Sequence, residues 1–329
     1  MLNYSSTAAI FLLFCSAISR EGREVNMVVY RELSSLCHDL GYSARALYTL
    51  SNSVAEHYHD VMIPKANGEQ RLLHVPDKFM KSVQKSIARN LLAYEEISPY
   101  AMAYRPGGST RANARPHVGA PMVMKLDVRK FFDHITYPMV KEKVFSSEKY
   151  SESNRVLLSV LCVYSHTTPQ GAPTSPAISN IIMRDFDNRV GDWCDKRNIS
   201  YTRYCDDLTF SGEFNPSEVK TFVKEELFKE GFFLNSRKTV VLRNGQRKEI
   251  TGIVVNEKAS VPAEYKKRIR QELFYCQKYG IDEHVKRLGL CESGESYARK
   301  LLGRINYVLS VEPENEEMKR GRTNLLLRL

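Results

Sequence analysis

The chain lacks close pairs of cysteines, internal repeats and any apolar run long enough to cross a bilayer. Its seven cysteines are an odd number without Cys-x-x-Cys spacing, which argues against a zinc site or a disulfide framework and for a reducing cytoplasm. The apolar stretch at residues 8–18 is shorter than the roughly 20 residues of a membrane helix. It also lacks the preceding Lys or Arg that a signal peptide normally has. We therefore expect a cytoplasmic protein without a membrane partner, in which this stretch is a helix or precedes a true start at Met27.

Positive charge is in excess, because 48 Lys and Arg residues stand against 38 Asp and Glu residues, a net charge of +10. Such an excess favours an anionic partner such as nucleic acid, although many basic proteins have no such partner. A hydrophobic content of 43% over 329 residues is enough for a substantial core. That core can lie in one large domain with subdomains or in two smaller domains.

Two adjacent carboxylates stand in the tetrapeptide Tyr204-Cys205-Asp206-Asp207, between two segments that have the composition of strands. The flanking residues mix β-branched and aromatic side chains, so we predict a hairpin with the acid pair at its bend. Successive side chains of a strand point to opposite faces, and both acids serve one site only where the backbone turns. An acid pair alone is most often a polar turn, so a catalytic role requires a third acid.

Asp127 can supply that acid, because it follows the apolar run at residues 118–126, which predicts a buried strand. A carboxylate at the end of such a strand can face Asp206 and Asp207 across a sheet. Oxygen ligands of this kind suit Mg²⁺, which proteins usually hold with one or two carboxylates together with substrate phosphates. Two such ions can clamp the attacking and leaving oxygens of a phosphoryl transfer.

A loop between these acids leads into an apolar helix and reads Pro169-Gln170-Gly171-Ala172-Pro173-Thr174-Ser175-Pro176. Gly171 permits close backbone approach, and the prolines fix the entry to the helix. A rigid loop that only caps a core helix would use the same residues. Taken in order, the Asp127 segment, the Gln170 loop and the acid pair resemble motifs A, B and C of reverse transcriptases, with Cys205 where Ala is commoner.

Two further segments narrow this resemblance to the reverse transcriptases of bacterial retrons and, more distantly, of group II introns. Asn113-Ala114-Arg115-Pro116-His117 fits the Asn-Ala-x-x-His signature of retron enzymes. Ile250-Thr251-Gly252 fits a second signature, usually Val-Thr-Gly, with a conservative change at its first position. Asn113 and His117 lie too far along the chain from the acids for spacing to assign them chemistry. We expect both, with Thr251, to shape a family-specific contact with RNA.

The resemblance implies roles around the three acids. Asp127, Asp206 and Asp207, with the backbone carbonyl of Val128, would hold two Mg²⁺ ions. Phe132 would lie against the sugar of the incoming deoxynucleotide and exclude a 2′-hydroxyl, while the adjacent Phe131 is the better candidate for the core.

A segment similar to motif D contains Lys238, the candidate general acid for the departing diphosphate. Asn67-Gly68 predicts a hairpin that resembles the polymerase fingers, where Arg71 and Lys65 could reach the triphosphate. Gln170 and Gly171 would line the same nucleotide site.

Helical patterns flank this central region. Apolar residues at helical spacing predict a core-facing helix over residues 77–94. Beyond residue 256 the chain is basic and its apolar residues again share helical faces, as in Tyr265, Ile269, Leu273 and Cys276, and in Leu301, Leu302, Ile305 and Leu309. These helices suit a thumb that grips a duplex by its phosphates. We expect its RNA contacts to include Lys266, Lys267 and Arg270.

We therefore predict an α+β right-hand polymerase. An N-terminal helical extension would span residues 1–53, fingers and an RRM-like antiparallel palm sheet residues 54–256, and a helical thumb residues 257–329. The resemblance implies a magnesium-dependent RNA-directed DNA polymerase that uses dNTPs. Retron enzymes start from a 2′-hydroxyl of their own structured non-coding RNA and leave a branched msDNA product. Such systems commonly act against phage, with an effector protein encoded nearby.

Two other classes of function remain open at this point. One is a different bacterial polymerase, either group II intron-like or an abortive-infection enzyme that makes DNA without a template. The other is an RNA-binding scaffold that restrains a toxin and whose polymerase site is idle. All three acids are intact, which disfavours the scaffold.

Overall fold

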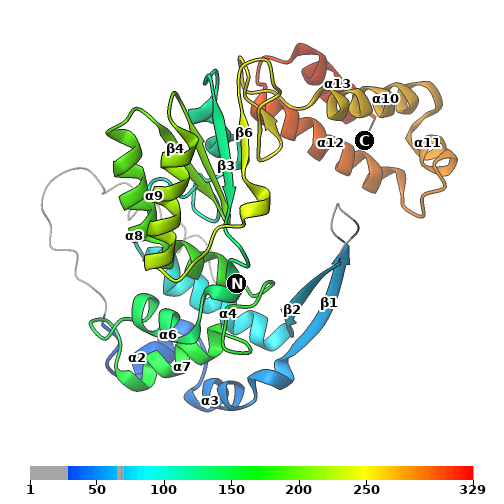
Figure 1. The fold of residues 1–329 in the computed structure, drawn as a ribbon. Helices are drawn as coiled ribbons and strands as arrows, with labels where there is room; N and C mark the ends of the chain where they lie inside the picture. The colour runs from blue at the N-terminus through cyan, green and yellow to red at the C-terminus, as the bar shows by residue number, and fades with distance from the viewer. Residues whose placement is uncertain (1–28, 65–67, 69, 329) are drawn as a thin grey trace, which may run out of the picture.

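The computed structural model describes residues 29–64, 68 and 70–328. The apolar stretch at residues 8–18 and Lys65, predicted to bind the triphosphate, lie outside these residues. Figure 1 shows a group of helices at the base, a sheet above them, a projecting hairpin and a helical arm at the C-terminus. None of the helices that the structure describes has the length and apolar character required to traverse a bilayer.

The base consists of helices from two separate parts of the chain: α2 (Leu33–Leu40), α3 (Ala44–Asn52), α4 (Lys78–Asn90), the short α6 (Tyr137–Met139) and α7 (Glu152–Cys162). Asp77 begins α4 because its carboxylate accepts a hydrogen bond from the Met80 amide at 2.8 Å, which is an N-cap. The predicted core face is confirmed, since Met80, Val83 and Ile87 are fully buried. The α-helix ends at Asn90, earlier than predicted, and a 3-10 turn continues to Tyr94.

A two-stranded hairpin projects from the base, as predicted. Its strands β1 (Tyr58–Pro64) and β2 (Gln70–Pro76) pair antiparallel along their whole length. Met62, Ile63 and Leu72 are exposed on this hairpin. In Figure 1 the hairpin points from the base towards the helical arm.

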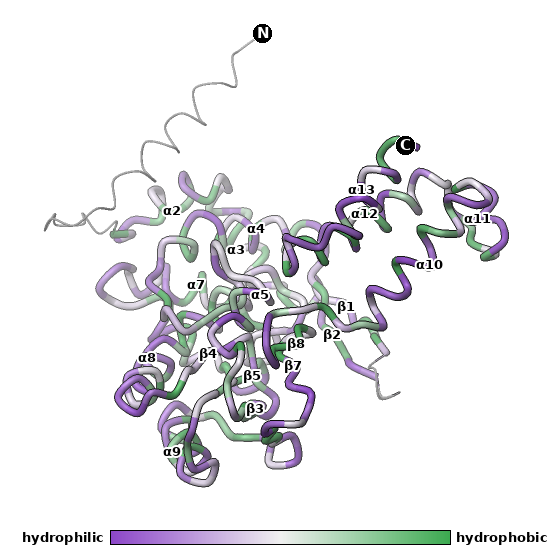
Figure 2. The backbone as a smooth tube through the Cα atoms, turned by 90° about the horizontal axis from the view of Figure 1, so that it is seen from above, coloured by the Kyte–Doolittle hydropathy of each residue, from purple (hydrophilic) through white to green (hydrophobic). Residues whose placement is uncertain are grey.

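The central sheet contains β3 (Val123–Asp127), β4 (Ser200–Tyr204), β5 (Asp207–Ser211) and β6 (Val240–Leu242). The strand order is β4-β5-β3-β6, and every neighbouring pair is antiparallel. The helices α8 (Ser175–Asp195) and α9 (Pro216–Lys229) lie together beside the strands in Figures 1 and 2. A short helix, α5 (Thr110–Ala114), precedes β3.

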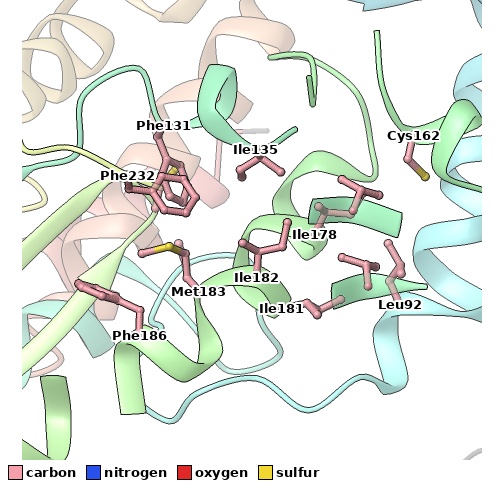
Figure 3. Close-up of a cluster of buried hydrophobic side chains, with 14 of the residues drawn as sticks. Leu92, Phe131, Ile135, Cys162, Ile178, Ile181, Ile182, Met183, Phe186 and Phe232 are labelled. Carbon is pink, nitrogen blue, oxygen red and sulfur yellow. The ribbon is translucent and has the colours of Figure 1, made fainter. Parts of the chain in front are cut away.

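The main core joins this sheet to the base through α8 (Figure 3). Ile178 and Ile182 are buried along this helix. Phe131 and Phe232, from other segments, are also buried in this core, and their ring centroids lie 5.5 Å apart. Pro176 in the first turn of α8 has a fixed φ that suits a helix start. The longest helix of the described chain therefore supports both the sheet and the base.

The C-terminal arm has a separate core. Its helices are α10 (Ala263–Tyr279), α11 (Ile281–Arg287), α12 (Gly294–Val311) and α13 (Glu316–Leu326), preceded by the ribbon β7 (Glu249–Ile250) and β8 (Ile253–Val254). Ile269, Leu273, Leu301 and Ile305 are buried, as their helical spacing predicts. The same cluster includes Val123 at the start of β3. Figure 2 shows this arm standing apart from α8 and α9.

The strand before Asp127 is shorter than the sequence predicts. The apolar run begins at residue 118, but β3 begins only at Val123. Gly119 has a positive φ of 74° and its amide donates to the Val255 carbonyl at 2.9 Å, so the preceding residues turn towards the ribbon. Hydropathy does not distinguish such a buried connection from a strand.

Candidate active site

The predicted acid hairpin is present. Tyr204 ends β4 and pairs with Asp207, the first residue of β5, so Cys205 and Asp206 form the two-residue turn. Cys205 has a positive φ of 61°, which is uncommon for a residue other than glycine. Asp206 therefore lies in the turn, and Asp207 lies in the strand beside it.

Asp127 lies directly opposite Asp207. The two are register partners of the antiparallel strands β3 and β5, and such partners place their side chains on the same face of a sheet. The Val128 amide donates to the Asp206 carbonyl at 2.9 Å, which joins the acid turn to the residue after Asp127. All three predicted acids thus meet at one end of the central sheet.

Two side chains from the segment after α9 bind Asp127. Lys238 Nζ lies 2.6 Å from one carboxylate oxygen, and Asn235 Nδ2 donates to the other at 3.1 Å. The backbone N–H of Asn235 also donates to the backbone carbonyl of Asp127 at 2.8 Å. The hydrogen bond between Lys238 Nζ and the Asp127 carboxylate raises the pKa of Lys238, whose ammonium is therefore retained. Sequence reasoning found Lys238 and assigned no role to Asn235, three residues earlier in the same segment.

Negative charge accumulates at Asp207. Loss of hydration within the site, followed by the charges of Asp206 and Asp127, raises the pKa of Asp207 to about 6. Asp207 itself is nevertheless exposed to solvent. Lys125 and Lys238 oppose this increase with their positive charges. The site is therefore a cluster of acids that attracts cations.

A fully buried ion pair supports the acid turn from behind. Arg203, the residue before Tyr204, binds both oxygens of Asp187 on α8, with distances of 2.6–2.9 Å. Its guanidinium also donates to the Cys205 carbonyl at 3.1 Å and to Asn180 Oδ1 at 3.2 Å. One side chain thereby fixes the turn to the helix. Arg203 and Asp187 were not predicted, although a charged residue inside an apolar strand is a signal of a buried pair.

Asn113 and His117, which we expect to shape a contact with RNA, are both fully buried, so their side chains act on that surface only through their neighbours. His117 Nδ1 lies 2.6 Å from Ser211 Oγ on β5, and Nε2 lies 2.8 Å from Thr202 Oγ1 on β4. Burial lowers the pKa of His117 to about 4, so the ring is neutral near pH 7. His117 therefore joins the two strands of the acid hairpin.

The two segments that resemble retron signatures contact each other. Asn113 Nδ2 donates to Thr251 Oγ1 at 3.4 Å, and the Thr251 hydroxyl donates to the Thr110 carbonyl at 3.2 Å. Thr251 has a positive φ of 45° and is partly buried. This pair joins α5 to the turn between β7 and β8.

The predicted nucleotide-binding residues are distributed over three elements. Gly171 has a φ of 121°, and a side chain there would approach the His74 carbonyl on β2 to 3.0 Å, so the close approach inferred from the sequence is present. Gln170 is partly exposed beside it, and Arg71 is exposed on β2. Phe132 is partly buried with its ring edge-to-face to Phe131 at 5.3 Å.

Of the predicted RNA contacts in the arm, Lys266 is engaged internally, with its Nζ 2.7 Å from Glu312. Arg270 pairs with Glu317 at 3.1 Å while remaining exposed. Lys267 is also exposed. Arg270 and Lys267 therefore face solvent, whereas Lys266 holds the end of α12 against α10.

The oxygen atoms at the acid end of the sheet suit Mg²⁺, a hard cation that binds carboxylate and carbonyl oxygens. Within residues 29–64, 68 and 70–328, no three His, Cys, Asp or Glu side chains already stand close enough to hold a metal ion. The Lys238 ammonium supplies the positive charge at Asp127. Mg²⁺ usually needs only one or two carboxylates together with substrate phosphates, and Asp127 and Asp207 are ligands of this type.

Residues 63–283 match the family model described as reverse transcriptase (RNA-dependent DNA polymerase). The chain is 30% identical to the retron Ec86 reverse transcriptase of Escherichia coli, over 80% of this chain and 84% of that protein. It is 31% identical to the retron Mx65 reverse transcriptase of Myxococcus xanthus, over 79% of this chain, and spans 63% of that relative's length. Among solved structures, a telomerase from Candida albicans in complex with telomeric RNA aligns with a TM-score of 0.45 and 12% identity, over 82% of this chain and 56% of that one.

Proposed function

The chain belongs to the bacterial retron reverse transcriptases, within the RNA-dependent DNA polymerase family, and we propose that it copies part of its own structured RNA into DNA. The observation that carries this proposal is the meeting of Asp127, Asp206 and Asp207 at one end of the sheet. Priming would start from a 2′-hydroxyl of the same RNA and leave a branched msDNA. The substrates are dNTPs and the RNA template.

Asp127, Asp206 and Asp207, with the carbonyl of Val128, are the proposed ligands of two Mg²⁺ ions. When bound, such ions lower the pKa of the attacking hydroxyl and neutralise the leaving diphosphate. Asn235 keeps one oxygen of Asp127 oriented through its hydrogen bond. Lys238 leaves the other oxygen and donates its proton at Nζ to the diphosphate, as a retained ammonium permits.

The remaining groups bind and orient the nucleotide. Phe132 lies five positions after Asp127, where its partly buried ring faces the sugar and excludes a 2′-hydroxyl. Gly171 and Gln170 form the floor of the site beside β2, and Arg71 of the same strand binds the triphosphate. The proximity of Gly171 to the His74 carbonyl supports this arrangement, because it brings the loop to the strand that carries Arg71.

We further propose three subdomains. Fingers and an RRM-like palm occupy residues 54–256, a thumb residues 257–329, and a helical extension residues 1–53. The helices α10–α13 supply most of a second hydrophobic cluster, which also takes in Val123, Ile250 and Ile253 from before residue 257. The cytoplasmic location, the effector protein and the action against phage remain predictions from the family.

The first experiment is extension of a DNA primer on an RNA template with and without Mg²⁺. We expect extension by the native protein and a loss of at least about a hundredfold in Asp206→Asn/Asp207→Asn, because charge stabilisation at the transferred phosphate is removed. Asp133→Asn is the matched control, since Asp133 is an exposed acid in the segment that follows Asp127, and primer extension by this variant should stay within about twofold of native, as is usual for surface substitutions. A native protein that fails to extend, even on its cognate RNA, contradicts the proposal.

Priming is tested with the cognate RNA alone. We expect a DNA product that stays covalently attached to RNA and that a 2′-deoxy substitution at the branch nucleotide abolishes. A product made equally well after that substitution would contradict 2′-hydroxyl priming. The scaffold alternative predicts instead that protection of cells against phage survives Asp206→Asn.

A further inference from the structure

The thumb contains a cavity that the polymerase reaction does not use. It has a volume of about 650 Å³ and lies among α10, α11 and α12. Its lining combines three tyrosines, three arginines and a histidine with one acid, Glu272. A cavity of this size, with a few polar groups among planar side chains, has the dimensions of a small-ligand site. We call it the thumb pocket.

Stacked rings form one wall of the thumb pocket. The Tyr275 ring lies parallel to Tyr279, with centroids 6.0 Å apart and an interplanar angle of 9°. It is also stacked on His284, at 5.6 Å and 22°. The Arg287 guanidinium lies over the Tyr279 ring at 3.9 Å. Flat aromatic and guanidinium surfaces of this kind bind unstacked nucleic-acid bases, largely regardless of sequence.

The charges of the thumb pocket favour an anionic ligand. Glu272, the single acid of the lining, is occupied by the Arg304 guanidinium and accepts a hydrogen bond from the Tyr297 hydroxyl at 2.7 Å. Arg287 pairs with Glu283, which is not part of the lining. Arg268 makes no ion pair with any described residue and is exposed. With Arg304 paired to Glu272 and Arg287 to Glu283, Arg268 is the guanidinium group of the lining that remains for a phosphate.

We propose that the thumb pocket binds one unpaired nucleotide of an RNA strand, with its base against the Tyr275 wall and its phosphate at Arg268. The inference rests on the proposed function only in taking RNA as a partner of this chain. An acidic peptide would use the arginines and leave the stacked rings without a ligand surface. A base inside a duplex is already stacked on both faces, so the thumb pocket selects loops, bulges and single strands.

The test uses the full chain and two RNAs of equal length, one unstructured and one a blunt duplex, in fluorescence anisotropy. We expect Arg268→Gln/Tyr275→Leu to bind the unstructured RNA about tenfold more weakly than the native protein, because one base stack and one phosphate contact are lost. Arg322→Gln is the matched control, an exposed arginine of α13 outside the lining. The Arg322→Gln variant should bind both RNAs more weakly by the same small factor. Circular dichroism and thermal unfolding of each variant verify that the thumb is folded.

A second readout locates the contact. RNA that carries 4-thiouridine should cross-link to the segment that contains Tyr275 and Tyr279, and an excess of unlabelled unstructured RNA should abolish the cross-link while the same excess of duplex should not. Native-like binding of unstructured RNA by the double variant, or equal losses on both RNAs, overturns the proposal. Displacement of the RNA by an acidic peptide identifies a protein site and also overturns the proposal.

Primer extension by the native protein separates the two proposals. If the native protein fails to extend while the double variant selectively loses unstructured RNA, the polymerase proposal fails and the thumb pocket stands. If the native protein extends and the double variant binds RNA normally, the thumb pocket fails alone.

Discussion

The palm and the thumb hold their charged residues in opposite ways. In the palm, Arg203 and Asp187 are fully buried and bind each other. In the thumb, pairs such as Arg299 with Glu295 lie on exposed helix surfaces, one turn apart. A buried charge that loses its partner costs several kcal/mol, whereas exposed pairs contribute about 1 kcal/mol or less. The palm is thus constrained by a fully buried pair, whereas the thumb combines exposed pairs with partly buried ones such as Lys266 with Glu312.

The largest effect on stability should come from Arg203→Met, which leaves the Asp187 carboxylate buried without its partner. We expect the free energy of unfolding to fall by about 3–5 kcal/mol. Urea denaturation followed by circular dichroism measures this loss. The double variant Arg203→Met/Asp187→Leu should regain part of it, because no unpaired charge remains. A single variant that loses less than about 1 kcal/mol would show that the palm tolerates charge as the thumb does.

Acid should weaken the palm through His117. Its pKa is lowered from 6.5 to about 4 by burial, so the unfolded chain takes up a proton at a higher pH than the native protein does. The stabilisation is present above pH 6.5 and is lost as the pH falls towards 4, with a total of about 3 kcal/mol. The hydroxyls of Ser211 and Thr202 that face the ring carry no charge, so they do not oppose the lowering of the His117 pKa.

Unfolding midpoints in urea between pH 7.5 and 4.5 test this. The stability of the native protein should fall more steeply with acid than that of His117→Gln, which has no proton to gain. Subtracting one profile from the other removes the contribution of groups such as Asp207, whose raised pKa acts in the opposite direction. Parallel profiles would rule out the buried neutral imidazole.

Gly171→Ala should cost about 2 kcal/mol, because a left-handed φ is disfavoured for alanine and the new methyl group meets the His74 carbonyl. Since the loop belongs to the proposed nucleotide site, the KM for dNTP should rise as well. Gly245→Ala is the matched control: Gly245 also has a positive φ, 84°, but nothing lies within 4 Å of the added methyl group. It should lose about 1 kcal/mol and keep the native KM. Equal effects in both variants would remove the role assigned to the close approach.

The smallest effect on stability should come from the thumb variant Arg270→Gln, at most about 0.5 kcal/mol, because its pair with Glu317 is exposed. Its effect should appear in RNA binding instead. We expect the slope of log affinity against log salt concentration to decrease by about one, for one lost phosphate contact. Glu317→Gln should not reduce that slope. A loss of stability larger than that of Gly171→Ala would reverse the contrast between palm and thumb.

Local patterns predicted the elements that carry the palm site. The acid pair lies at a turn whose flanking strands are recognisable from their side chains, and Asp127 follows an apolar run. The helical faces of α4, α10 and α12 were predictable for the same reason, because their period reflects burial on one side.

What the sequence did not reveal depends on partners far along the chain. His117 is satisfied by Thr202 and Ser211, which lie 85 and 94 residues later. Nothing local distinguishes such a buried histidine from an RNA ligand. Likewise Lys266 and Lys267 are adjacent in a basic helix, and only the position of Glu312 decides which of them is engaged. The thumb pocket requires three helices to be placed together and has no motif at all.

The strand β3 connects the two cores mechanically. Val123 at its start is packed in the thumb cluster, and Asp127 at its end faces Asp207. Four residue steps of an extended strand cover about 13 Å, and neighbours on both sides hold this strand straight. β3 is thus a short rigid rod with one end in each subdomain. The strand that carries Asp127 is therefore anchored at its other end in the thumb core, so one short element sets the position of this carboxylate relative to the thumb.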